Sequence, residues 1–213
     1  MRVETLTVGP MQENCYLVID DATSAAALVD PGEEGDRLVA TVRRAGARLE
    51  AIWVTHAHLD HVGGIAAVKR ALDVPVYLHP DDEPLYRIAD RQAAAYGLSM
   101  EPPPPPERTL ADGQRLRLGA LEFSVLHAPG HAPGHVVIHG EGVAFCGDCV
   151  FAGSIGRTDL PLSDGRRLAA SLERIAALPP DTILYPGHGP ATTLGEELRT
   201  NPFLNGSARV VGF

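Results

Sequence analysis

The sequence predicts a mixed α/β (α+β) protein in which two β-sheets pack face to face and helices cover their outer surfaces. Three observations lead to this fold. Both halves of the chain have the same order of elements: several strand-like segments, an amphipathic helix and a short apolar strand. The helices are apolar on one side only, as helices that pack on a sheet are. The length of 213 residues is enough for a large hydrophobic core.

Five strands and two helices are predicted in the first half. The first helix, residues 36–45, ends before Gly46, a common C-terminal cap. The second helix, residues 64–72, is built mainly of small residues. The predicted strands are residues 2–8, 14–19, 25–29, 51–54 and 74–78.

The second half repeats this order with one longer helix at residues 165–178. We expect Leu168, Leu172 and Ile175 to share its inward face. The predicted strands are residues 114–118, 121–126, 136–139, 143–145 and 182–185. Residues 1–213 are therefore expected to form one domain.

The stretch between the halves, residues 80–106, interrupts the pattern. A helical segment is predicted near residues 83–96, and five consecutive prolines follow at 102–106, where helix and central strand are both excluded. We interpret this stretch as a surface excursion that overhangs the functional site. The residues of the excursion that could line the entrance to that site are Tyr86, Tyr96 and Met100.

Charge and composition narrow the function classes. The formal net charge of −9 would repel a phosphate backbone, so no nucleic-acid partner is expected. No run of about eighteen apolar residues occurs, and the first residues lack the pattern of a secretory signal. Three cysteines do not make a disulfide framework. We expect a cytoplasmic protein with a small-molecule substrate and no membrane partner, present as a monomer or small homo-oligomer.

The strongest chemical signal is an HxHxDH segment directly after an apolar strand. His56 and His58 are two apart on an extended segment, so their side chains point the same way and can share a metal ion. Asp60 and His61 follow a turn and face a neighbouring position. The alternative is a polar loop of solvated histidines, which so dense a group of ligand-type residues disfavours.

These residues do not complete two metal sites, so further ligands must come from elsewhere. Three candidates lie just after an apolar strand and beside a glycine: His131, Asp148 and His188. A single loop histidine is more often merely exposed. Together with the HxHxDH segment, however, the three residues supply a full set of ligands for two ions.

The ordered motifs HxHxDH, PGH, GD and PGHG resemble those of the metallo-β-lactamase-fold superfamily over nearly the whole chain. The resemblance implies a four-layer αββα sandwich, in agreement with the pattern of elements above. The implied ligands of the first metal ion are His56, His58 and His131. Those of the second are Asp60, His61 and His188, and Asp148 bridges the two.

Two further segments resemble the small bacterial glyoxalase II-like branch of that superfamily: residues 153–161, GSIGRTDLP, and residues 201–204, NPFL. Glyoxalase II hydrolyses hydroxyacyl-glutathione thioesters and has a C-terminal helical domain that helps to hold glutathione. We expect that domain to be absent, because the sequence ends soon after His188. Arg157 is a partial match to the basic loop of glyoxalase II.

The resemblance implies a metal-dependent hydrolase that uses a metal-bound hydroxide to cleave a small thioester or ester. Two divalent ions, zinc being expected and iron or manganese the alternatives, would lower the pKa of water to about 7. Asp60 would orient the hydroxide and is the candidate catalytic residue. Arg157 would bind an anionic group of the substrate; its alternative role is a salt bridge with Asp159 or Asp164.

Two other functions stay open. A mononuclear iron dioxygenase that acts on glutathione persulfide belongs to a branch that resembles this chain at residues 156–159. Because such an enzyme needs only two histidines and one aspartate, the fuller set of candidates favours the hydrolase. A non-enzymatic metal-binding module is disfavoured by the same set.

Cysteines carry weaker signals. Cys146 and Cys149 have redox or zinc-knuckle spacing, but we prefer to interpret them as small apolar residues beside Asp148. Cys15 is expected in the core, and Phe151 in the core or in a pocket wall.

The remaining histidines are interpreted conservatively. We expect His79 and His139 to be structural or exposed. His127 and His135 flank the loop of His131, where we expect them to satisfy backbone groups of a turn. The alternative for both is to orient a metal ligand.

Overall fold

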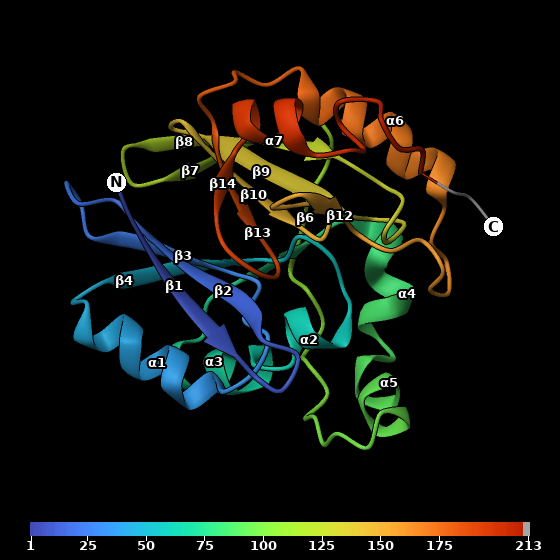
Figure 1. Ribbon diagram of the computed structural model, residues 1–213. Helices are drawn as coiled ribbons and strands as arrows, with labels where there is room; N and C mark the ends of the chain where they lie inside the picture. The colour runs from blue at the N-terminus through green and yellow to red at the C-terminus, as the bar shows by residue number, and fades with distance from the viewer. Residues whose placement is uncertain (211–213) are drawn as a thin grey trace.

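The protein has four layers in the computed structural model, which describes residues 1–210 (Figure 1). Two six-stranded sheets face each other in the middle. Helices α1 (Gly35–Arg44) and α3 (Ile65–Leu72) cover the outer face of the first sheet. Helices α6 (Gly165–Ala176) and α7 (Leu194–Thr200) cover that of the second. This arrangement confirms the predicted αββα fold class.

The first sheet has the order β1-β2-β3-β4-β5-β6. β1, β2 and β3 pair antiparallel, whereas β3 to β6 pair parallel. The parallel pairing of β3 and β4 requires a crossover, which α1 provides. The strands are β1 (Arg2–Val8), β2 (Glu13–Ile19), β3 (Ala25–Val29), β4 (Arg48–Trp53), β5 (Val76–Leu78) and β6 (Arg108–Thr109).

The second sheet has the order β14-β13-β10-β9-β8-β7. Its one parallel pair, β10 with β13, is joined through α6, so both halves contain a parallel pair connected by a helix. The strands are β7 (Arg115–Leu118), β8 (Leu121–His127), β9 (Val136–Gly140), β10 (Val143–Gly147), β13 (Ile183–Pro186) and β14 (Thr192–Thr193). A separate hairpin consists of β11 (Val150–Phe151) and β12 (Ser154–Ile155).

Strand β2 is buried along its whole length. Alternate residues of a strand point to opposite faces of the sheet. Cys15, Leu17 and Ile19 pack against the helices outside the first sheet, which confirms the predicted core position of Cys15. Tyr16 and Val18 pack against the second sheet. Because both faces are covered, no position of this strand is exposed.

Aromatic side chains join the two sheets across the central core. Trp53 on β4 meets Phe123 on β8 edge to face, with ring centroids 5.4 Å apart. Tyr16 on β2 lies against Phe145 on β10 at 5.5 Å. These rings contribute much of the apolar area that holds the sheets together.

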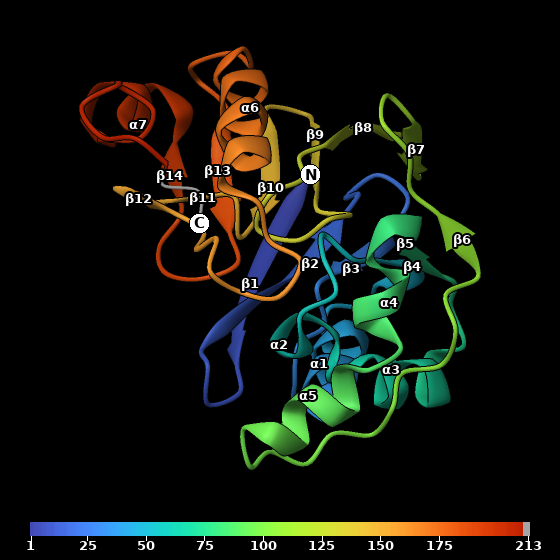
Figure 2. The same cartoon turned by 90° about the vertical axis from the view of Figure 1, so that its right-hand side faces the viewer.

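The stretch between the halves differs from the predicted single helix. It contains the 3-10 turn η1 (Pro80–Asp82) and two short helices, α4 (Glu83–Tyr86) and α5 (Ala89–Ala95). Ile88 has φ −117° and ψ 10°, which interrupts the helical hydrogen bonds between them. Figure 2 shows α4 and α5 near α2. The prolines at 102–106 form neither helix nor strand, as predicted.

Two of the three candidate entrance residues lie elsewhere. Tyr86 is buried, and its hydroxyl donates to the carbonyl oxygen of Pro104 at 2.9 Å. Met100 packs against the core outside the first sheet. Tyr96, in contrast, is 64% exposed. The prediction was wrong for Tyr86 and Met100 because both are apolar enough to fill the space beneath the excursion.

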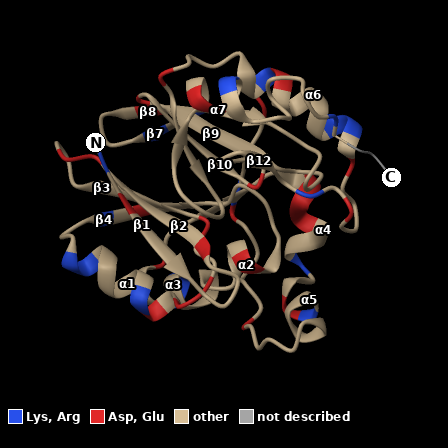
Figure 3. Cartoon of the chain, in the orientation of Figure 1, with Lys and Arg blue, Asp and Glu red and all other residues tan. Residues whose placement is uncertain are grey.

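Charged residues of both signs are mixed along the outer helices (Figure 3). Ion pairs such as Arg37 with Glu34 at 2.9 Å are exposed and contribute little to stability. Within residues 1–210, none of the helices has the length and apolar character needed to cross a lipid bilayer.

We expect Phe123→Ala to lower the free energy of unfolding by about 3–5 kcal/mol, because it leaves a cavity between the sheets. Urea unfolding followed by circular dichroism measures this change. Ile183→Ala is the control, since Ile183 is 39% exposed, and should cost less than about 1 kcal/mol. Equal losses in both variants would contradict the central position of Phe123.

Candidate metal centre

The predicted ligands lie just beyond the carboxyl ends of strands from both sheets. His56 follows β4, Asp148 follows β10 and His188 follows β13. Because β10 and β13 are parallel, their carboxyl ends meet at one edge of the second sheet. The amide of Gly187 donates to the carbonyl oxygen of Gly147 at 2.8 Å, which places Asp148 beside His188.

The HxHxDH segment turns sharply from strand to helix. His58 is the extended N-terminal cap of α2 (Leu59–Val62), so Asp60 and His61 lie in the first helical turn. This turn packs directly on the loop after β3, where a Cβ on Gly32 would lie only 1.9 Å from the carbonyl oxygen of Asp60. Glycine is required there because the two backbones are in contact.

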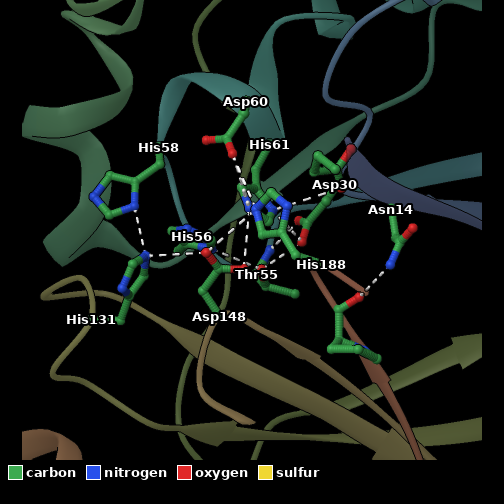
Figure 4. A network of polar contacts seen from close by, with 12 residues as sticks. Asn14, Asp30, Thr55, His56, His58, Asp60, His61, His131, Asp148 and His188 are labelled. Atoms are coloured by element: carbon green, nitrogen blue, oxygen red, sulfur yellow. Dashed lines mark hydrogen bonds and ion pairs between the residues drawn. The ribbon is translucent and has the colours of Figure 1, made fainter. Parts of the chain in front are cut away.

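Three histidines form the first group of potential ligands: His56, His58 and His131. One ring nitrogen of each lies within 4.8 Å of the others. The Nδ1 of His58 is 2.9 Å from the Nε2 of His131, and Figure 4 shows the two rings pointing toward each other.

Asp60, His61 and His188 form the second group, again with ligand atoms within 4.8 Å of one another. The Nε2 of His188 lies 3.2 Å from the Oδ2 of Asp60. The Nε2 of His61 lies 3.9 Å from the same oxygen.

Asp148 lies between the two groups (Figure 4). Its Oδ1 is 3.4 Å from the Nε2 of His61. Its Oδ2 is 3.5 Å from the Nε2 of His131 and 3.6 Å from that of His188. The fold therefore brings together all the ligand candidates that the sequence singles out, with one carboxylate facing both groups.

Hydrogen bonds on the outer side of the rings determine which nitrogen is free. The Nδ1 of His131 donates to the carbonyl oxygen of Arg157 at 2.9 Å, and the Nδ1 of His61 lies 3.1 Å from the Oδ2 of Asp30. These oxygens only accept hydrogen bonds, so each Nδ1 carries a proton. In a neutral ring Nε2 then keeps a free lone pair toward the centre, as in metal-ligating histidines.

Buried atoms without a hydrogen-bond partner gather at this place. Within the described chain they include the Nε2 of His56, the Nε2 of His61 and the Oδ1 of Asp148. Such atoms cost about 1–3 kcal/mol each when nothing binds them. Cations bound in the two ligand groups, with Asp148 between them, would satisfy all three atoms, so these residues fit a metal centre.

The local pKa values favour a bound cation. Burial lowers the pKa of His56 far below its usual value, and that of His58 to about 3, so both rings are neutral. Burial also acts to lower the pKa of His61, but the charges of Asp148 and Asp60 outweigh it and raise this pKa. The negative charge that would hold a proton on His61 also attracts a metal ion.

Asp30 and Thr55 hold the HxHxDH loop in place, and neither role was predicted from the sequence. The Oδ1 of Asp30 accepts from the amide of Thr55, and its Oδ2 from the Thr55 hydroxyl, each at 2.6 Å. The hydroxyl oxygen lies 3.1 Å from the Nδ1 of His56. The available signal was the Asp-Pro-Gly turn that ends the strand next to β4.

Asp82 connects the two halves of the centre. It is fully buried and accepts from the amide of Ala57 at 2.8 Å and from that of Gly134 at 2.5 Å. One amide belongs to the HxHxDH loop and the other to the loop of His131. Burial raises the pKa of Asp82 to about 6, against the effect of these two hydrogen bonds. Sequence alone gives no signal for this role.

His135 has the role expected from the sequence, with an added consequence for the centre. It is fully buried, and its Nε2 accepts from the backbone amide of Asp148 at 3.0 Å. Its Nδ1 lies 3.3 Å from the Sγ of Cys149. Asp148 lies in the turn after β10, so His135 satisfies a backbone group of a turn and thereby also holds the backbone of a candidate ligand. Cys149 and Cys146 pack in an apolar cluster, as expected.

A cavity of about 650 Å³ opens onto both groups of ligands. His58, Asp60, His131, Asp148 and His188 form part of its wall. The apolar residues of the wall include Met11, Leu59, Tyr96, Phe151, Ile155 and Leu160. The cavity therefore suits a substrate with an apolar body.

Arg157 lines this cavity and also forms the salt bridge considered as its alternative role. Its Nε and Nη2 donate to the two carboxylate oxygens of Asp159 at 2.6 and 2.7 Å. Both side chains are largely exposed, so solvent screens this pair.

Residues 8–188 match the sequence profile of the Metallo-beta-lactamase superfamily. The chain belongs to this superfamily of metal-binding hydrolases, and the resemblance identified from the motifs is thereby confirmed.

Three similar proteins place the chain more closely. It is 39% identical over 210 residues to "Hydroxyacylglutathione hydrolase GloC" of Haemophilus influenzae, covering 96% of this chain and 99% of that protein. The structure of TTHA1623 in a di-iron-bound form has a TM-score of 0.89 at 51% identity, covering 95% and 100%. The BLEG-1 B3 metallo-beta-lactamase structure has a TM-score of 0.89 at 37% identity, covering 95% and 99%.

We expect Asp82→Ala to lower the free energy of unfolding by about 2–6 kcal/mol, because two buried amides lose their acceptor at about 1–3 kcal/mol each. Urea unfolding in the presence of a chelator measures the loss. Asp81→Ala is the matched control, since that side chain is 53% exposed. If the two variants were equally stable, Asp82 would not hold the loops together.

Proposed function

We propose that the protein is a dinuclear metallohydrolase that cleaves a small thioester or ester. The observation that carries this proposal is the position of Asp148 on the wall of an open cavity, where its carboxylate lies 3.4 to 3.6 Å from ring nitrogens of both ligand groups. A pair of neighbouring metal ions is typical of enzymes that activate water for hydrolysis.

The ligand set supports this assignment. The proposed ligands of the first ion are His56, His58 and His131, and those of the second are Asp60, His61 and His188, with Asp148 shared. When bound, the ions would polarise a carbonyl oxygen and lower the pKa of water to about 7. Zinc is the proposed metal, and the di-iron-bound form of TTHA1623 supports iron as the alternative.

Asp60 is the proposed catalytic residue. Its Oδ2 contacts His188 and His61, and the side chain lines the cavity. Figure 4 shows its other oxygen pointing away from these contacts. That oxygen, Oδ1, would accept a hydrogen bond from the attacking water, orient it and take up its proton.

The substrate is proposed to be an anionic thioester. A thiolate leaves without needing a proton from the protein, so no further acid is required. The apolar cavity wall would hold the body of the molecule, and Arg157 would bind an anionic group by giving up part of its contact with Asp159. The name of the Haemophilus influenzae relative makes a hydroxyacyl-glutathione the first substrate to test.

The metal content and activity of protein purified without added metal test this function. We expect about two ions of zinc, iron or manganese per chain, together with hydrolysis of a hydroxyacyl-glutathione thioester. Asp148→Ala should lose at least one ion and the activity, because one residue serves both groups. The control Asp181→Ala, at an exposed position, should keep both.

Two results would overturn the proposal. One iron per chain with oxygen consumption on glutathione persulfide would indicate a dioxygenase, for which the second ligand group has no use. A folded Asp148→Ala protein with full metal content and full rate would show that Asp148 is not shared between two ions.

We expect Arg157→Ala to raise the KM for an anionic thioester by up to about fivefold with little change in kcat, because an exposed ion pair is worth up to about 1 kcal/mol. Steady-state kinetics measures both parameters. When an uncharged ester replaces the thioester in a separate assay, the KM of the variant should equal that of the wild type. Arg166→Ala, an exposed arginine on α6, is the control. An unchanged KM for the anionic thioester would show that Arg157 does not bind the substrate and only pairs with Asp159.

A further inference from the structure

A second cluster of ligand-type side chains lies outside the cavity. His79 follows β5 of the first sheet, and His127 ends β8 of the second. Their rings stack with centroids 4.0 Å apart and an interplanar angle of 11°. Asp81 lies beside them, with its Oδ2 3.9 Å from the Nδ1 of His79. None of the three residues lines the cavity or belongs to the ligand groups described above.

Hydrogen bonds give both rings the same tautomer. The Nε2 of His127 lies 3.1 Å from the carbonyl oxygen of Pro133 and must donate to it, so Nδ1 has a free lone pair. The Nδ1 of His79 accepts from the amide of Asp81 at 3.2 Å, so this Nδ1 is also unprotonated. Each ring therefore presents an unprotonated Nδ1, the form in which a neutral imidazole binds a metal ion.

The arrangement repeats a feature of the main centre. There His131 donates one ring nitrogen to a backbone carbonyl and keeps the other free. His127 does the same with Pro133, and such outer hydrogen bonds are typical of metal-ligating histidines. One ligand atom from each of His79, Asp81 and His127 lies within 4.8 Å of the others.

We propose that His79, Asp81 and His127 bind a further divalent transition-metal ion, such as Zn²⁺, with water completing its coordination. Two imidazoles and one carboxylate are a ligand set that suits zinc. In the stack the two Nδ1 lone pairs lie in nearly parallel planes, so the ring of His79 would turn out of the stack and exchange its hydrogen bond with the Asp81 amide for the metal contact. Asp81 favours a cation here and Arg167 opposes it, while the charge of Asp112 is offset by its ion pair with Arg174 at 2.9 Å.

Such an ion would link the two halves of the chain. His79 caps the turn η1, from which the chain continues into α4 and α5, and His127 belongs to the second sheet. Gln92 and Tyr96, farther along the same excursion, line the cavity. An ion at this place would therefore hold the base of the excursion against the second sheet.

Calorimetric titration of the full-length protein with Zn²⁺ alone tests the proposal. The wild type should bind one equivalent more than Asp81→Ala and His127→Ala, whatever the occupancy of the main centre. Asp81 is exposed, so its variant should fold even if the His127 variant does not. His139→Ala, a half-buried histidine on β9 outside these clusters, is the matched control and should keep every equivalent.

Equal numbers of Zn²⁺ equivalents in the wild type and in a folded Asp81→Ala protein would overturn the proposal. Loss of the equivalent in the His139 control would also overturn it, because the ion would then lie elsewhere. Asp148→Ala separates this site from the main centre, since it should lose metal there and keep the Asp81-dependent equivalent.

Discussion

The shared carboxylate of Asp148 is the interaction on which the rest of the centre depends. Histidines from separate loops converge on it: His61 lies nearest Oδ1, and His131 and His188, one from each group, lie nearest Oδ2. An ionised carboxylate is unfavourable when buried unless cationic partners surround it. Burial acts to raise the pKa of Asp148, but the charge of His61 outweighs it and keeps this pKa well below its ordinary value. The site thus concentrates negative charge where its ring nitrogens meet, which is the condition for holding cations.

Residues around the centre hold the ligands in fixed positions. The backbone of Asp148 is held by His135, and the loop of His56 is held by Asp30 through Thr55. Each hydrogen bond joins segments from different strands, so the ligands are positioned by the packing of the sandwich rather than by their own loops. Asp82 likewise positions ligand loops from both halves of the chain, because it accepts hydrogen bonds from the amides of Ala57 and Gly134.

The substrate side of the centre is built differently. Its cavity wall comes largely from the excursion between the halves and from the loops around the β11–β12 hairpin. Tyr96 and Arg157 are exposed there, in contrast to the buried ligands. A rigid metal site beside a more exposed wall allows related proteins to share a reaction centre and differ in substrate, because loops tolerate change that a packed core does not.

Residue order alone was enough for the fold class and the ligand candidates, because strand and helix periodicity and the HxHxDH spacing are local properties. The broken helix at 83–96 was not predictable, since Tyr86 turns inward to reach Pro104. Asp82 and the stacked pair of His79 and His127 were also beyond sequence reasoning. Their roles arise from contacts between residues far apart in the chain, and only the packing of the two sheets against each other brings such residues together.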